Sequence, residues 1–128
     1  MPKISVIMGT YNESKEYVCA AIDSILNQTF SDFEFIIILD NPNNDEMGKL
    51  LEEYKNKDER IKLIFNEVNL GLAKSLNKGI QLATSPYIAR MDADDIAFPN
   101  RFETQYNYLQ KEELCDVLAT NAVYIDEN

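Results

Sequence analysis

Histidine is absent from this sequence of 128 residues, and cysteine and glycine are scarce. Without histidine, the chain cannot build the usual zinc sites or a catalytic triad with a histidine base. The two cysteines, Cys19 and Cys115, show no metal-ligand or redox spacing, so we expect small core residues in a reducing compartment. The four glycines form neither a G-x-G-x-x-G nor a Walker-type pattern, which argues against a backbone cradle for phosphate.

Positive charge is also in short supply. Lysine and arginine number 12 against 22 acidic residues, which gives a net charge of −10. Nucleic acid is held by concentrated positive charge, so we expect no nucleic-acid partner. The acidity is explained most simply by solubility, and a phosphorylated ligand fits only with a cation between it and the protein. No apolar run has the length of a signal peptide or a membrane span, so we expect a single cytoplasmic domain.

Short apolar segments alternate with amphipathic ones along the chain. The pattern predicts strands over residues 4–8, 33–39, 61–65, 87–91 and 117–125, and helices over 18–26, 47–54, 72–83 and 99–113. The isoleucines at 36–38 predict a strand buried on both faces, which is typical of parallel sheets. Asn43 and Glu46 have the spacing of a capping box for the second helix. The alternation predicts an α/β fold with a mainly parallel sheet flanked by helices.

Polar and acidic residues follow three of the predicted strands. In open α/β sheets, ligands bind beyond the carboxyl ends of the strands, so these residues define one candidate site. They are Thr10, Tyr11, Asn12 and Glu13 after the first strand, Asp40 after the second, and Asp92, Asp94 and Asp95 after the fourth. Carboxylates held close together repel one another, and a bound cation relieves that repulsion.

The run Asp92-Ala93-Asp94-Asp95 is the sharpest signal. Strand alternation predicts that Asp92 and Asp94 point to one side and Asp95 points elsewhere. Two carboxylates on one side can hold Mg²⁺ or Mn²⁺ and leave coordination positions for substrate phosphates. Such an ion would also stabilise a departing diphosphate. The alternative is a turn or helix-capping cluster, but the neighbouring acidic strand ends favour the metal site.

Three residues at the first two strand ends are candidates for nucleoside contacts. The carboxylate of Asp40 only accepts hydrogen bonds, so it can select a base edge with an N–H donor, such as the imide of uracil. Tyr11 could lay its ring along that base, and Glu13 could reach the base or sugar. Structural roles stay open for all three: a turn cap for Asp40, packing for Tyr11 and a first-turn acid favoured by the helix dipole for Glu13.

Three basic residues are expected to be structural. Arg90 alternates with Asp92 on one strand, which predicts an ion pair. Lys74 is expected on a solvated helix face. Arg101 is expected to brace the loop after the acidic run.

Four blocks, in order, carry a resemblance to a known family: SVIMGTYNES, ILNQTFSDFEFIIILD, NLGLAKSLNKGI and ARMDADDIAFPNRF. The chain resembles glycosyltransferase family 2, and its second block is especially similar to the SpsA-like members. The resemblance implies a GT-A (Rossmann-like) fold, a three-layer α/β/α sandwich. It also implies inverting transfer of a sugar from a nucleoside-diphosphate sugar, usually a UDP-sugar, with Mn²⁺ or Mg²⁺ as cofactor.

The resemblance also implies roles for individual residues. Thr10, Tyr11, Glu13, Asp40 and Asp92 would bind the nucleotide sugar, with Tyr11 and Asp40 at the base and Asp92 near the ribose and diphosphate. Asp94 would ligate the metal together with Asp92. The chain departs from the family in two places. It has Asp40-Asn41-Pro42-Asn43 where Asp-Asp-Gly-Ser is common, and Leu76 where an arginine is frequent.

Family members carry a further acceptor-binding portion that includes the general base. We find no candidate for that base within residues 1–128, so we expect the catalytic base beyond Asn128 and a fragment that is inactive alone. The chain would then be the nucleotide-sugar-binding part of a longer enzyme. Its acceptor could be a carbohydrate, a lipid-linked carrier or a protein. Homodimer formation and attachment of the full protein to the inner face of the membrane are left open.

The sequence lacks features that two other classes of protein require. A signalling receiver domain requires paired acids directly after the first strand, where this chain has Gly9-Thr10-Tyr11-Asn12. A nucleotidyltransferase usually grips its triphosphate with a glycine-rich, basic loop, which this sequence lacks. A non-catalytic sensor of nucleotide sugars stays open.

Overall fold

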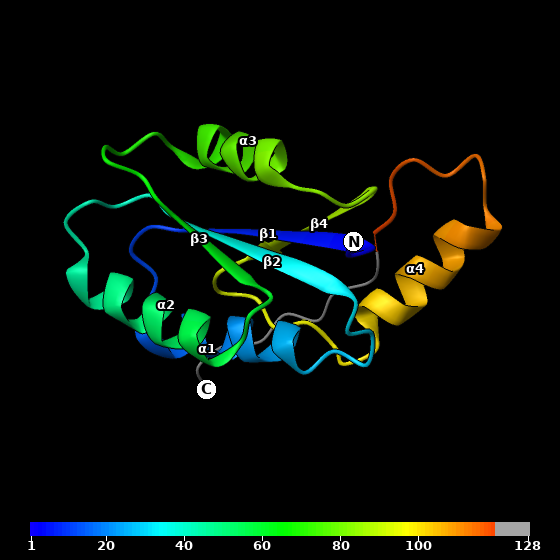
Figure 1. The fold of residues 1–128 in the computed structure, drawn as a ribbon, viewed down its shortest axis with the longest axis horizontal. Coiled ribbons are helices and arrows are strands. Elements are labelled where there is room, and N and C mark those ends of the chain that lie inside the picture. Colours follow the sequence, from blue (N-terminus) through cyan, green and yellow to red (C-terminus); the bar gives the residue numbers. More distant parts are fainter. Residues whose placement is uncertain (120–128) are drawn as a thin grey trace.

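The structure is a computed structural model, and it describes residues 1–119 (Figure 1). Within these residues, strands and helices alternate in the order β1 (Ile4–Thr10), α1 (Lys15–Leu26), β2 (Phe33–Leu39), α2 (Asp45–Lys57), β3 (Ile61–Phe65), α3 (Leu72–Leu82), β4 (Tyr87–Asp92) and α4 (Arg101–Lys111). All strand pairs are parallel, and the order in the sheet is β3-β2-β1-β4. The predicted α/β fold is confirmed. In the strand predicted over 117–125, residues 117–119 form no strand, and the rest lie outside the described residues.

Helices cover both faces of the sheet, with α1 and α2 on one side and α3 on the other (Figure 1). The larger core lies on the α1 and α2 side, where Val6 and Phe35 of the sheet pack with Ile22 of α1 and Leu51 of α2. Ile36 and Ile38 lie in a second, smaller core on the α3 side. The isoleucine run of β2 is therefore buried on both faces, as predicted, and the architecture is a three-layer sandwich.

The start of α2 differs from the prediction. Asn44 is the N-cap, and its side-chain oxygen accepts a hydrogen bond from the Met47 N–H at 3.1 Å. The predicted capping box of Asn43 and Glu46 is therefore wrong. The cause is a turn before the helix, in which the side chain of Asn41 accepts from the Asn43 N–H and the Asn41 carbonyl accepts from the Asn44 N–H. This turn delays the helix by one residue.

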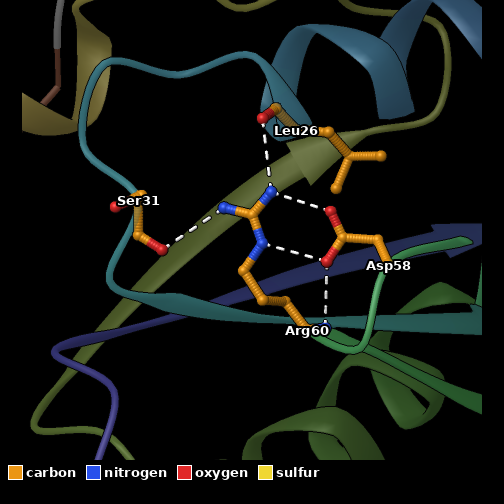
Figure 2. A network of polar contacts seen from close by, with 4 residues as sticks. All are labelled: Leu26, Ser31, Asp58 and Arg60. Atoms are coloured by element: carbon orange, nitrogen blue, oxygen red, sulfur yellow. Dashed lines mark hydrogen bonds and ion pairs between the residues drawn. The ribbon is translucent and has the colours of Figure 1, made fainter.

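Arg60 ties together three segments near the amino end of β3 (Figure 2). Its guanidinium holds both carboxylate oxygens of Asp58, at 3.0 and 2.8 Å, and donates to the carbonyls of Leu26 and Ser31. The same group lies 4.4 Å from the centre of the Phe33 ring. The hydrogen bonds from Arg60 lower the pKa of Asp58 below its usual value, against partial burial. The end of α1 is thereby fixed relative to β2 and β3.

A second polar network surrounds Glu34 near the amino end of β2. Its carboxylate accepts from the hydroxyl of Ser5 and the ammonium of Lys62, both at 2.8 Å. The N–H and hydroxyl of Thr84 donate to it at 2.9 Å each. Burial alone would raise the Glu34 pKa, but these hydrogen bonds outweigh it and lower the pKa to about 2. The network joins the turn before β4 to the other three strands.

Two further findings concern the hydropathy of the helices and the burial of the cysteines. None of the helices within residues 1–119 combines the length and hydropathy needed to cross a membrane. Cys19 and Cys115 are free thiols of intermediate burial. The prediction that both are core residues is therefore wrong.

Candidate functional site

The ends of β1, β2 and β4 meet at the carboxyl edge of the sheet. The register pairs Gly9 of β1 with Asp92 of β4, and the Asp40 N–H donates to the Thr10 carbonyl at 2.9 Å. By strand alternation, Asp40 and Asp92 lie on the α3 face, with Gly9 on the strand between them. A Cβ at Gly9 would come within 3.4 Å of the Leu72 side chain. The absence of a side chain at Gly9 therefore lets Leu72 of α3 lie close to the strand between the two acidic strand ends.

Three carboxylates form an acidic cluster, composed of Asp92, Asp94 and Asp95. Each offers one oxygen, and these oxygens all lie within 4.8 Å of one another. The structure brings Asp92 and Asp94 together, as predicted, but the prediction that Asp95 points elsewhere is wrong. The strand ends at Asp92, and the Asp95 N–H donates to the Asp92 carbonyl at 3.1 Å. This turn replaces strand alternation and returns the third carboxylate to the other two.

The acidic cluster carries an electrostatic cost. Partial desolvation raises the pKa of Asp95, and the charges of Asp92 and Asp94 raise it further. Three hard oxygen donors at this spacing fit a divalent cation such as Mg²⁺ or Mn²⁺, which would neutralise the repulsion. The donor set therefore suits the metal that the sequence predicts.

Arg90 and Arg101 lie beside the cluster, and all three basic residues have the structural roles expected of them. Arg90 forms an exposed ion pair with Asp92 at 3.5 Å. Arg101 donates to the Arg90 carbonyl at 2.9 Å and so braces the segment after the cluster. Burial lowers the pKa of Arg101, although the charge of Asp95 opposes this change. Lys74 is exposed on the first turn of α3.

Asp40 lies deep in the edge of the sheet, where its carboxylate has four hydrogen-bond donors around it, including the Ser75 side chain. It is 6% exposed, and one carboxylate oxygen accepts from the side-chain amide of Asn66 at 2.9 Å and from the Leu70 N–H at 2.7 Å. The other oxygen accepts from the Gly71 N–H at 2.8 Å. Burial would raise its pKa, but these bonds lower it. The turn-capping role that the sequence left open is therefore present, and it fixes the loop before α3.

The turn after β1 presents one aromatic ring and one buried hydroxyl. Tyr11 is 45% exposed, and its carbonyl accepts from the side-chain amides of Asn41 and Asn44 at 3.3 Å each. Thr10 is buried, and its hydroxyl has no hydrogen-bond partner among the described residues. The carboxylate of Glu13 accepts from the Tyr11 N–H at 3.2 and 3.3 Å, so it stabilises its own turn.

Comparison with known proteins identifies the family of this chain. A model of glycosyl transferase family 2 matches residues 5–128. The chain belongs to this family. An uncharacterized glycosyltransferase of Methanocaldococcus jannaschii is 49% identical over 127 residues, which are 99% of this chain and 44% of that protein. The O-antigen biosynthesis glycosyltransferase WbnJ of Escherichia coli is 42% identical over 125 residues, covering 98% of this chain and 48% of that protein.

Solved structures of S. aureus TarS share the fold of this family 2 chain. TarS 1–349 in complex with UDP-GlcNAc superposes with a TM-score of 0.78 and 26% sequence identity over 87% of this chain and 32% of that one. The GT-A fold predicted from the sequence is confirmed by this match. The chain spans less than half the length of the two curated relatives named above.

Sequence reasoning missed two features of the site. Strand alternation predicts that Asp95 points away from Asp92 and Asp94, although Asp95 lies three residues after Asp92, a spacing that a β-turn brings together. The buried amide of Gln28, which contacts the segment after the cluster, carries no local signal because its partners lie about 70 residues away.

Proposed function

We propose that this chain is the donor-binding part of an inverting glycosyltransferase that uses a nucleoside-diphosphate sugar, with uracil as the base. The observation that carries the proposal is the acidic cluster at the carboxyl edge of a parallel sheet, in a chain of glycosyl transferase family 2. The TarS structures with UDP and UDP-GlcNAc support the choice of donor. Transfer to an acceptor hydroxyl is the reaction of the whole protein.

In this proposal, Asp92 and Asp94 hold Mn²⁺ or Mg²⁺, and Asp95 completes the set of carboxylates. The bound ion supplies positive charge that offsets the charge of the diphosphate as it leaves. The chain has a net charge of −10, so its own residues give the diphosphate little attraction. The carboxylates would hold the cation, and its positive charge would suit an anionic donor on an acidic protein.

The nucleoside is placed over the ends of β1 and β2. The exposed ring of Tyr11 offers a surface on which a base can stack, and Thr10, whose hydroxyl is buried, contributes through its carbonyl, which holds the Asp40 N–H. Asp40 already accepts from Asn66, Leu70 and Gly71, and the Ser75 side chain is a fourth donor, so a hydrogen bond from the imide N–H of uracil has to replace one of these partners. Glu13 contributes by ordering the turn that carries Tyr11.

The reaction proposed is a single displacement. A general base removes the proton of the acceptor hydroxyl, the hydroxyl oxygen attacks the anomeric carbon, and the diphosphate leaves from the opposite side. The curated relatives are about twice as long as this chain. We therefore place the base and the acceptor contacts of the whole protein outside residues 1–128.

Calorimetric titration of UDP into the purified chain tests this proposal. UDP should bind in the presence of Mn²⁺ and bind at least tenfold more weakly without it, as expected when a metal carries the diphosphate contact. Asp94→Asn should abolish the effect of Mn²⁺. Glu59→Gln, which removes the same charge from an exposed residue before β3, should not change it. GDP at equal concentration tests the base.

Each outcome has a defined meaning. UDP binding that depends on Mn²⁺ and on Asp94 supports the donor site. Preference for GDP would replace uracil by guanine and keep the metal site. Binding that is equally strong with and without Mn²⁺, or unchanged in Asp94→Asn, would refute the role given to the acidic cluster.

A further inference from the structure

We propose that Gln28, just past the end of α1, is a positioning residue that holds the acidic cluster in its ligand-binding arrangement. The side chain is far from the cluster in sequence and does not belong to it. It acts through the segment at residues 97–102, which leads from the cluster into α4. The inference deepens the proposed function, because it explains how the cation site is kept assembled.

The amide of Gln28 is buried, and both its nitrogen and its oxygen have hydrogen-bond partners. It is 6% exposed, and its Nε2 donates to the Ser24 carbonyl at 3.1 Å and to the Phe98 carbonyl at 2.6 Å. Its Oε1 accepts from the Phe102 N–H at 3.0 Å. One side chain thus joins α1 to two points of the segment after the cluster. A buried amide with all these partners is costly to replace, because each partner would be left unpaired.

Neighbours of Gln28 strengthen the same clamp. The Ser24 hydroxyl accepts from the Ala97 N–H at 3.0 Å. The Thr29 N–H donates to the Pro99 carbonyl at 2.9 Å, and the Thr29 hydroxyl donates to Glu103 at 2.7 Å. The last turn of α1 and the residues after it therefore bind three consecutive residues, 97, 98 and 99, and two residues in the first turn of α4, 102 and 103.

The clamp also caps α4. Asn100 is the N-cap of this helix, but its side chain makes no capping hydrogen bond. The first N–H groups of a helix have no partner within the helix. Gln28 supplies the missing acceptor for the Phe102 N–H, so the start of α4 depends on α1.

The clamp reaches the cluster over a very short stretch of chain. Ile96 alone separates Asp95 from Ala97, whose N–H is bound by Ser24. Ala93 and Ala97 are buried in the larger core, at 3% and 8% exposure, so both ends of the acidic segment are anchored. Arg101, at the start of α4, also donates to the Arg90 carbonyl and so ties the segment after the cluster back to β4.

Such an anchor is needed because the cluster repels itself. Like charges held this close repel one another, and the repulsion is stronger beside the protein than in bulk water. Three carboxylates within 4.8 Å therefore push the segment apart when no cation is bound. β4 holds one end of this segment through its ladder with β1, and Gln28 with its neighbours holds the other.

The test replaces Gln28 and measures the segment directly. In Gln28→Leu, the amide hydrogens of Ala97 and Phe102 should exchange about tenfold faster, while amides of β2 should keep their rates. Mn²⁺ affinity, followed by electron paramagnetic resonance of the free ion, should fall about tenfold, as for residues that support metal ligands. Ser24→Ala, which removes one bond of the clamp, should give a smaller change in the same direction.

Controls separate positioning from loss of stability. Gln28→Glu would bury a carboxylate against the Ser24 and Phe98 carbonyls, so Gln28→Met, which keeps the side-chain length without a charge, is the second variant if Gln28→Leu does not fold. Glu34 lies near the opposite edge of the sheet from the acidic cluster. Glu34→Gln should therefore lower the free energy of unfolding and leave Mn²⁺ affinity unchanged. Unaltered exchange at Ala97 with native Mn²⁺ affinity in a folded Gln28 variant would overturn the inference. If the native chain binds no Mn²⁺, the proposed function falls, and the exchange rates still decide whether Gln28 holds the segment.

Discussion

Replacing Glu34 by glutamine tests how a buried charge stabilises this sheet. The carboxylate is 3% exposed and receives four hydrogen bonds, from Ser5, Lys62 and twice from Thr84. Glutamine has nearly the same shape but no charge, and its NH₂ group would face the donors of Lys62 or Thr84. The substitution therefore removes the charge and at least one of the four hydrogen bonds.

The size of the effect follows from the pKa of Glu34. Its pKa falls from 4.5 to about 2 on folding. Such a change corresponds to about 3 kcal/mol of stability at neutral pH, and this is an upper value because Lys62 is half-exposed. A carboxylate with a depressed pKa stabilises the fold above its unfolded pKa and loses that effect as the pH falls through its folded pKa. The contribution should drop to roughly 1.5 kcal/mol at pH 3.

Urea unfolding of both proteins at pH 7 and pH 3 measures this change. Other carboxylates are common to both proteins, so they cancel in the difference between the two free energies of unfolding. We expect Glu34→Gln to be less stable by about 2–3 kcal/mol at pH 7, with the difference reduced by about half at pH 3. A difference that is the same at both pH values would refute the reasoning, because it would mean that the charge of Glu34 does not contribute.

Three further substitutions test the packing and the caps, each by urea unfolding. Gly79→Ala should destabilise by about 1–3 kcal/mol although alanine favours helices, because its Cβ would come within 2.7 Å of Ile7. Asn44→Ala should lower the free energy of unfolding by about 1 kcal/mol because it removes the α2 cap, and Asn43→Ala should lower it by less. A larger effect of Asn43→Ala would instead support the capping box of Asn43 and Glu46. Arg60→Lys should cost about 1–2 kcal/mol, since lysine cannot hold Asp58 with two parallel bonds; an unchanged midpoint would contradict this.

Much of the fold could be predicted, because segments that are buried in the structure are apolar in the sequence. The strand at 33–39 is an unbroken apolar run apart from Glu34, and it ends where Asp40 turns inward to bind the loop before α3. The strand at 61–65 stops at Asn66 for a similar reason. The start of α2 could not be predicted, because Asn43 and Asn44 are equally good caps and the preceding turn decides between them.

The candidate site was predictable in its location and less so in its details. Parallel strands bring their carboxyl ends together, so Asp40 and Asp92 had to share one edge. The direction of Asp95 depends on a turn, and periodicity says nothing about side chains beyond the end of a strand. Glu34 and Gln28 appear in the sequence as ordinary polar residues. Their roles come from partners 28 to 74 residues away, which only the tertiary structure brings into contact.

The most direct test of the central claim is to locate the bound cation. Mn²⁺ broadens the NMR signals of nearby nuclei, so titrating it into the ¹⁵N-labelled chain with UDP present maps the site without any assumption about sugar or acceptor. We predict that the amide signals of residues 92–95 disappear first, and that those of Glu34 and Lys62 near the opposite edge of the sheet persist. Broadening centred on another part of the chain, or spread evenly over its acidic surface, would contradict the account.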